Sequence, residues 1–73
     1  QNLEFGMVGD DVRELQKYLN NNGFLVDTTG VGSPGNESIY FGSLTQSALI
    51  KFQQSVGLPA YGYFGPMTRA VIQ

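Results

Sequence analysis

Three of the four tyrosines of the chain are spaced in a way that could build a binding surface. Tyr40 and Tyr63 each stand directly before a Phe-Gly pair, and Tyr61 precedes Tyr63 by two residues. Because a tyrosine ring has an apolar face and a polar hydroxyl, the three could form an aromatic platform near two helix N-termini, whose free N–H groups could hold a carboxylate. The alternative is that each ring wedges a loop against the core, with its hydroxyl in water.

Two other polar side chains could contribute to such a surface. Arg69, the only cation of the last helical stretch, could pair with a ligand carboxylate. The simpler interpretation is a surface arginine that pairs with a glutamate or with nothing. Asn36 lies in a long polar loop, where its amide could donate and accept hydrogen bonds. The candidate ligand-binding residues are therefore Tyr40, Tyr61, Tyr63, Asn36 and Arg69.

The composition excludes several kinds of chemistry. The 73 residues include 4 basic and 6 acidic side chains but no His and no Cys, so the usual zinc sites, a Ser-His-Asp triad and a thiol nucleophile cannot form. A net charge of −2 has the wrong sign for a phosphate backbone, which disfavours nucleic acid and a helix-turn-helix DNA-binding role. No apolar run approaches the roughly 20 residues of a membrane span, so we expect no membrane insertion.

The carboxylates could form two further kinds of site, a calcium site or a glycosidase pair, and the sequence supports both poorly. Asp27, Asn36 and Glu37 could offer oxygen ligands to calcium, but their spacing does not match an EF-hand loop. A pair of carboxylates could serve a glycosidase, but a domain of this length offers no cleft around one. We therefore expect no metal, no cofactor and no catalytic residue. The chain should bind a ligand rather than catalyse a reaction on it.

Hydrophobic spacing predicts the first helix. Its apolar residues recur at intervals of four, three and four, which marks one buried stripe: Val8, Val12, Leu15 and Leu19. Asp11 with Glu14 three residues later predicts a capping pair. Gly23 ends the helix, because glycine readily takes the left-handed conformation needed there.

Two further helices follow a long loop at residues 27–38. Ser43 with Gln46 predicts a second capping box, and Gly57 should end that helix with a positive φ. Its stripe is predicted to be Ala48, Leu49, Phe52 and Val56. Pro66 suits the first position of a third helix. The inward face of that helix is predicted to be Met67, Ala70 and Val71.

An internal repeat supports this organisation. Residues 40–49 line up with residues 63–72, with Tyr, Phe, Gly and Thr identical at matching positions. Each copy contains a bend, a glycine and a helix start. Phe41, Phe52 and Phe64 are assigned to the core, and Gln16 and Gln53 are expected to tie down neighbouring loops through their amides. The predicted fold class is all-α, a compact three-helix bundle with a long loop between helices 1 and 2.

The ordered motifs resemble a known family. Residues 6–23 read G-x-x-G-x-x-V-x-x-L-Q-x-x-L-x-x-x-G, residues 41–58 read F-G-x-x-T-x-x-A-L-x-x-F-Q-x-x-x-G-L, and residues 62–68 read G-x-x-G-x-x-T. Together they resemble the type 1 peptidoglycan-binding domain found beside cell-wall hydrolases. The chain departs from that pattern in its enlarged 27–38 loop. If the loop borders the ligand groove, the glycan or peptide preference should differ from that of the family, or binding should be lost.

The resemblance implies a non-catalytic module that binds peptidoglycan, through its glycan strand or stem peptide, and anchors an attached domain to the wall. It also implies a place in the bacterial envelope or outside the cell. Because the chain starts at Gln1 rather than Met, we expect residues 1–73 to be one domain, a monomeric module of a longer multidomain protein. The alternative is a structural or protein–protein interaction module of a cell-surface or envelope protein.

Overall fold

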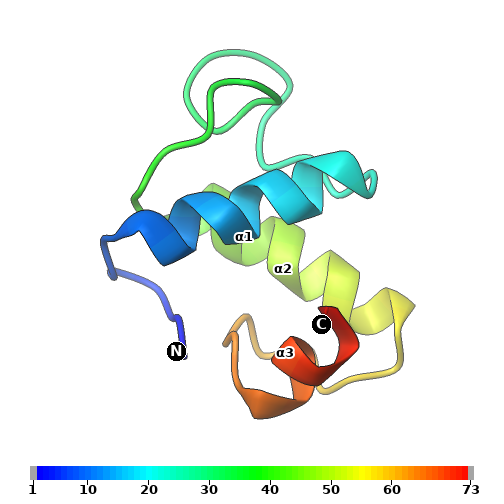
Figure 1. Ribbon diagram of the computed structural model, residues 1–73. Coiled ribbons are helices and arrows are strands. Elements are labelled where there is room, and N and C mark those ends of the chain that lie inside the picture. The colour runs from blue at the N-terminus through cyan, green and yellow to red at the C-terminus, as the bar shows by residue number, and fades with distance from the viewer. Residues whose placement is uncertain (1, 73) are drawn as a thin grey trace.

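The computed structural model describes residues 2–72 and contains three helices, α1 (Asp10–Asn21), α2 (Ser43–Ser55) and α3 (Pro66–Ile72). Figure 1 shows α1 lying across α2, with α3 near the C-terminal half of α2 and the loop after α1 extending away from the helices. Within the described residues, two isolated β-bridges occur and no strand. The predicted three-helix class with a long first loop is confirmed. Gln1 and Gln73 lie outside the described residues.

The core is built from one stripe of each long helix. Val12, Leu15 and Leu19 of α1 are buried as predicted, and they meet Ala48, Leu49 and Phe52 of α2 in one apolar cluster with Leu3, Val26 and Phe41. Phe52 contacts the rings of Tyr18 and Phe24 edge-on, at centroid distances of 5.6 and 5.5 Å. The core assignment is confirmed for Phe41 and Phe52, whereas Phe64 is only partly buried against the cluster.

The N-terminal segment, residues 3–9, pairs with the bends that precede α2 and α3. Leu3 and Phe64 exchange backbone hydrogen bonds of 2.9 and 2.7 Å, and Val8 forms an antiparallel bridge with Tyr40. Val8 therefore lies before α1 and is 64% exposed, so its assignment to the helix stripe was wrong. The helical spacing of the apolar residues continues N-terminally past Gly9 to Val8, but the backbone at Gly9 still has an extended conformation.

Both long helices begin at glycine rather than at a capping side chain. Gly9 and Gly42 occupy the N-cap positions, and neither α1 nor α2 has a side-chain cap hydrogen bond. The predicted capping pairs Asp11–Glu14 and Ser43–Gln46 were therefore wrong, because Ser43 is already helical and Asp11 lies one residue inside α1. The acidic residues of the first turn of α1 still oppose the positive end of the helix dipole.

Both long helices end in the same way. After α2 the Leu58 N–H donates to the Gln53 carbonyl at 2.9 Å and the Gly57 N–H to Gln54 at 3.3 Å; after α1 the Phe24 and Gly23 N–H groups make the corresponding bonds. This is the Schellman pattern, which places glycine in the left-handed region. Gly57 has φ 78°, which confirms the prediction.

The short α3 presents a different face from the one predicted. Met67 and Val71 are 60% and 43% exposed, and Ala70 is exposed, whereas Thr68 is buried and Ile72 packs against the core. The predicted inward face was therefore wrong. A seven-residue helix buries one narrow stripe, and here a hydrogen-bonded threonine determines which stripe it is.

Candidate ligand-binding grooves

The bend before α2 is held by a buried amide of α1. The Gln16 side chain is 1% exposed, and its Nε2 donates to the Tyr40 carbonyl at 3.0 Å and to Thr45 Oγ1 at 2.8 Å. Its Oε1 accepts a 2.6 Å hydrogen bond from the Ser38 N–H. One side chain thus satisfies two backbone groups and a hydroxyl. We call this set the first glutamine bridge.

The bend before α3 is held in the same way by α2. Gln53 is 2% exposed; its Nε2 donates to the Tyr63 carbonyl at 2.9 Å and to Thr68 Oγ1 at 3.1 Å, and its Oε1 accepts from the Gly62 N–H at 3.0 Å. This is the second glutamine bridge. The prediction that both glutamines tie down neighbouring loops is confirmed.

Each bridge leaves a tyrosine ring lying on a glycine. A Cβ atom added at Gly42 would lie 2.7 Å from Tyr40 Cε2, and one added at Gly65 would lie 2.7 Å from Tyr63 Cε2. Both distances are well inside van der Waals contact, so any other residue would displace the ring. Tyr40 and Tyr63 are 50% and 40% exposed. The ring therefore rests on the backbone while part of its surface remains available to a ligand.

Two grooves accompany these rings, with volumes of about 180 and 170 Å³. Five matching positions of the repeat line both of them, together with the glutamine of each bridge. In the first groove they are Gln16, Tyr40, Gly42, Ser43, Leu44 and Thr45. In the second groove they are Gln53, Tyr63, Gly65, Pro66, Met67 and Thr68.

The outer walls of the two grooves differ. Val26 and the long loop, with Val31, Gly32 and Ser38, close the first groove, whereas Leu58, Pro59 and Tyr61 close the second. Tyr61 is 80% exposed, so its ring extends the aromatic surface of the second groove. The long loop therefore borders a candidate groove; the changed ligand preference stays a prediction.

The long loop is fixed by a buried asparagine that the sequence did not single out. Asn20, 7% exposed, accepts from the Val26 N–H at 2.9 Å and donates to the Gly32 carbonyl at 3.0 Å and to Glu37 Oε2 at 2.9 Å. The hydrogen bond from Asn20, helped by the Gly35 N–H, lowers the pKa of Glu37. In the sequence Asn20 reads as part of a polar helix end; its position one turn after Gln16 was the available signal.

The five predicted site residues do not form one cluster. Tyr61 and Tyr63 share the second groove, and Tyr40 lines the first. Asn36 is exposed, lines neither groove and bonds within its own loop to Ser33 Oγ at 3.3 Å. Arg69 lines neither groove, and its Nη1 donates to the amide oxygen of Asn2. The expectation that it pairs with a glutamate or has no partner was therefore wrong.

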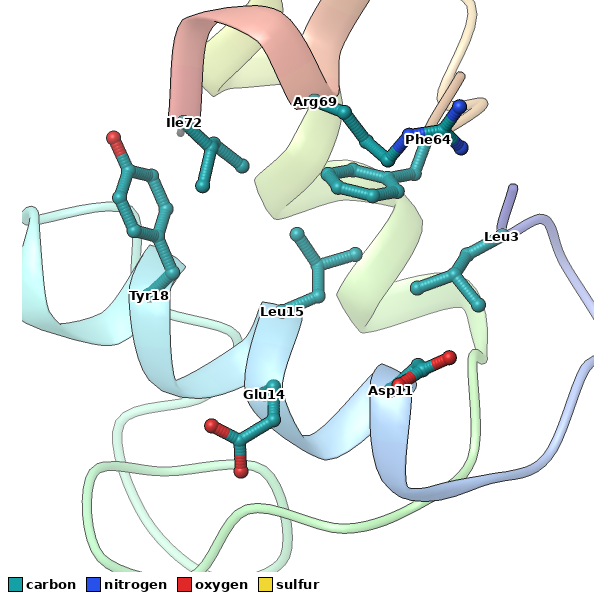
Figure 2. A pocket seen from close by; sticks show the side chains of 8 residues that line it. All are labelled: Leu3, Asp11, Glu14, Leu15, Tyr18, Phe64, Arg69 and Ile72. Atoms are coloured by element: carbon teal, nitrogen blue, oxygen red, sulfur yellow. The ribbon is translucent and has the colours of Figure 1, made fainter. Parts of the chain in front are cut away.

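Arg69 borders a third pocket, of about 250 Å³, between α1 and α3. Figure 2 shows Leu15 of α1 pointing toward Ile72 of α3 and the Phe64 ring, with Leu3 nearby and Arg69 beside the ring. Asp11 and Glu14 of α1 also border it. The pocket is therefore an apolar hollow with charged residues of both signs at its edge.

Comparison with known proteins identifies the family of the chain. Residues 8–73 match the family described as "Putative peptidoglycan binding domain". The chain belongs to this family. Membership of this family implies association with the cell wall.

Two solved structures share the fold of this peptidoglycan-binding domain. The crystal structure of the SleB N-terminal domain is 38% identical, with a TM-score of 0.81 over 99% of this chain and 88% of that one. A peptidoglycan-binding protein from Clostridioides difficile, solved in complex with glutamine hydroxamate, is 28% identical, with a TM-score of 0.78 over 99% of this chain and 40% of that one. A search of curated proteins gave no match. No helix among residues 2–72 is both long and apolar enough to cross a membrane.

Proposed function

We propose that this peptidoglycan-binding domain holds an attached domain against the bacterial cell wall, without catalysis of its own, and that it contacts the wall through its exposed tyrosines. The observation that carries this proposal is the placing of the Tyr40 and Tyr63 rings, each half-exposed beside a groove and fixed from beneath by a glycine and a glutamine bridge. Such rings are already ordered before a ligand arrives, so binding costs little side-chain entropy.

The chemistry of these rings suits a glycan strand. The face of a pyranose ring presents C–H groups with partial positive charge, and the face of an aromatic ring is negative. Ser43 lines the first groove together with Tyr40, and its hydroxyl could bond to an acetamido group or a ring hydroxyl. Tyr61 adds a second ring, beside Tyr63, to the second groove. Asn36 and Arg69 remain candidates for contacts to stem peptides that hang from the strand.

Peptidoglycan also offers peptide carboxylates, and Arg69 is the candidate that could pair with one. Because its guanidinium already bonds to Asn2, a carboxylate would have to compete with an uncharged amide oxygen. The module is proposed to be monomeric, to belong to a longer protein, and to act in the bacterial envelope or outside the cell. The lack of His and Cys in the sequence supports a role in binding rather than in catalysis.

Co-sedimentation with purified sacculi tests the proposal. The wild-type domain should pellet with sacculi at both low and high salt, because stacking on tyrosine is less salt-sensitive than ion pairing. The double variant Tyr40→Ala, Tyr63→Ala should stay in the supernatant. Phe5→Ala is the matched control, because Phe5 is 54% exposed and lines none of the three pockets. A folded wild type that stays in the supernatant would refute the proposal.

The pocket between α1 and α3 favours a second candidate function, packing against a neighbouring protein domain. Its walls include Tyr18, Phe64 and Ile72, which are only partly buried and which a partner side chain could cover. This function predicts a stable dimer, or a complex with the attached domain, whose stability does not change when glycan is added. Sedimentation equilibrium of the isolated domain, with and without glycan fragments, distinguishes the two.

A further inference from the structure

We infer that the domain has two separate glycan subsites, one in each groove, and that it binds two units of the repeating polymer at once. This inference rests on the proposed function, because it assigns the number and position of the sites within it. Four observations of different kinds support it: the sequence repeat, the two glutamine bridges, the two ring-on-glycine contacts and the two grooves.

The equivalence of the grooves is structural as well as sequential. In both, a buried glutamine from the preceding helix fixes the tyrosine carbonyl, and the same glutamine bonds a threonine at the third position of the next helix. In both, the ring lies 2.7 Å from the position of the missing glycine Cβ. Holding each bend in place would require only the hydrogen bonds of its glutamine. Each bend also leaves a tyrosine ring partly exposed beside a groove, which a purely structural role would not require.

The size of each groove indicates a small unit of the ligand. Pockets that enclose a whole small molecule measure about 300–1,000 Å³, whereas these grooves measure about 180 and 170 Å³. One groove therefore fits one sugar ring or one side group. A polymer of repeated units offers a further unit to the second groove.

The two bends are tied to the same short segment. Leu3 pairs with Phe64 and Val8 with Tyr40, so the bends contact positions five residues apart in the N-terminal segment. Five residues span at most about 18 Å even when fully extended, and the turn at Gly6, with φ 95°, shortens this segment further. The same short segment therefore links the bends that carry the two subsites and limits how far apart its two contact points can lie.

The differing walls predict differing preferences. Ser43 of the first groove stands at the position of Pro66 in the second. The outer wall of the first groove also carries Ser38, whereas that of the second carries Pro59. We expect the first to favour the more polar face of a sugar unit and the second to favour an apolar group, with Tyr61 covering it. A glycan of two alternating sugars provides such unequal units.

Titration of the isotope-labelled domain with the N-acetylglucosamine–N-acetylmuramic acid disaccharide tests the inference by NMR. Saturable shifts are expected in two sets of amides, one around Gly42 and Leu44 and one around Gly65 and Met67. Tyr40→Ala should remove only the first set, and Tyr63→Ala only the second. Unchanged spectra elsewhere show that each variant remains folded.

Binding to intact sacculi supplies the second measurement. Because the second contact to a polymer is intramolecular, each single variant should bind sacculi about tenfold or more weakly than wild type, and the Phe5→Ala control should bind normally. Shifts confined to one groove, or to the pocket between α1 and α3, would overturn the two-subsite inference while sacculus binding upheld the proposed function. Loss of both sacculus binding and shifts in the folded wild type would overturn both.

Discussion

The second glutamine bridge gives the sharpest prediction about stability. Replacing Gln53 by leucine keeps an apolar stem of similar size but removes every hydrogen bond that its amide makes. The buried Gly62 N–H then loses its acceptor and the Tyr63 carbonyl loses its donor. A buried polar group without a partner costs about 1–3 kcal/mol, so the two backbone groups together cost about 2–6 kcal/mol.

This cost is large for a domain of this size, because a core below about 70–80 residues rarely supplies more than about 3–5 kcal/mol. Even the lower figure of about 2 kcal/mol should lower the melting temperature by about 8–16 °C, since 1 kcal/mol corresponds to about 4–8 °C in domains of 60–100 residues. At the upper figure Gln53→Leu would be unfolded at 25 °C.

The neighbouring glutamine provides the matched control. Gln54 lies on the same helix, is exposed, and makes no side-chain hydrogen bond in the described structure. Gln54→Leu should therefore change the free energy of unfolding by less than about 0.5 kcal/mol. Thermal unfolding of both variants, followed by circular dichroism, measures the difference. Melting temperatures within about 2 °C of each other would show that the Gln53 amide does not hold the bend.

Three other perturbations follow from single contacts. Gly57→Ala should lower the free energy of unfolding by about 1 kcal/mol or more, because φ is 78° there; chemical denaturation measures it. The hydrogen bond from Asn20 lowers the pKa of Glu37 below its ordinary value of 4.5, so its stabilisation of the long loop is complete above that pH and is lost as pH falls through the lower folded pKa. Glu37→Gln should remove this acid dependence, read from amide exchange of the loop. Gly42→Ala should displace the Tyr40 ring and weaken sacculus binding, measured by co-sedimentation, while helix content stays unchanged.

The sequence predicts the long helices well because their burial follows the helical period. Val12, Leu15 and Leu19 recur at helical spacing, and Gly57 ends α2 where a left-handed residue is needed. Periodicity alone does not show where extended chain becomes helix, which is why Val8 was placed on the wrong side of Gly9. It also fails for α3, because in so short a helix the bond to Thr68 outweighs the apolar pattern.

The candidate site was predicted in part. The repeat located Tyr40 and Tyr63 at matching places, and the structure sets each beside a groove. That these are two grooves rather than one platform depends on how the helices cross, which is long-range information that residue types do not carry. The loop anchor Asn20 was missed because a buried asparagine and an exposed one look alike in sequence.

The unequal linkers of the two glutamine bridges indicate how readily this fold can change. Gln16 and Tyr40 are 24 residues apart, whereas Gln53 and Tyr63 are only 10 apart, yet both pairs close the same hydrogen bond. By loop-closure entropy the longer linker costs only about 0.8 kcal/mol more. The long loop is thus an insertion that evolution could lengthen, shorten or replace at little cost to folding, with its ends held by Gln16 and Asn20. Because it walls the first groove, its variation offers relatives a route to new wall chemistries on an unchanged scaffold, and offers the protein engineer a site for grafting.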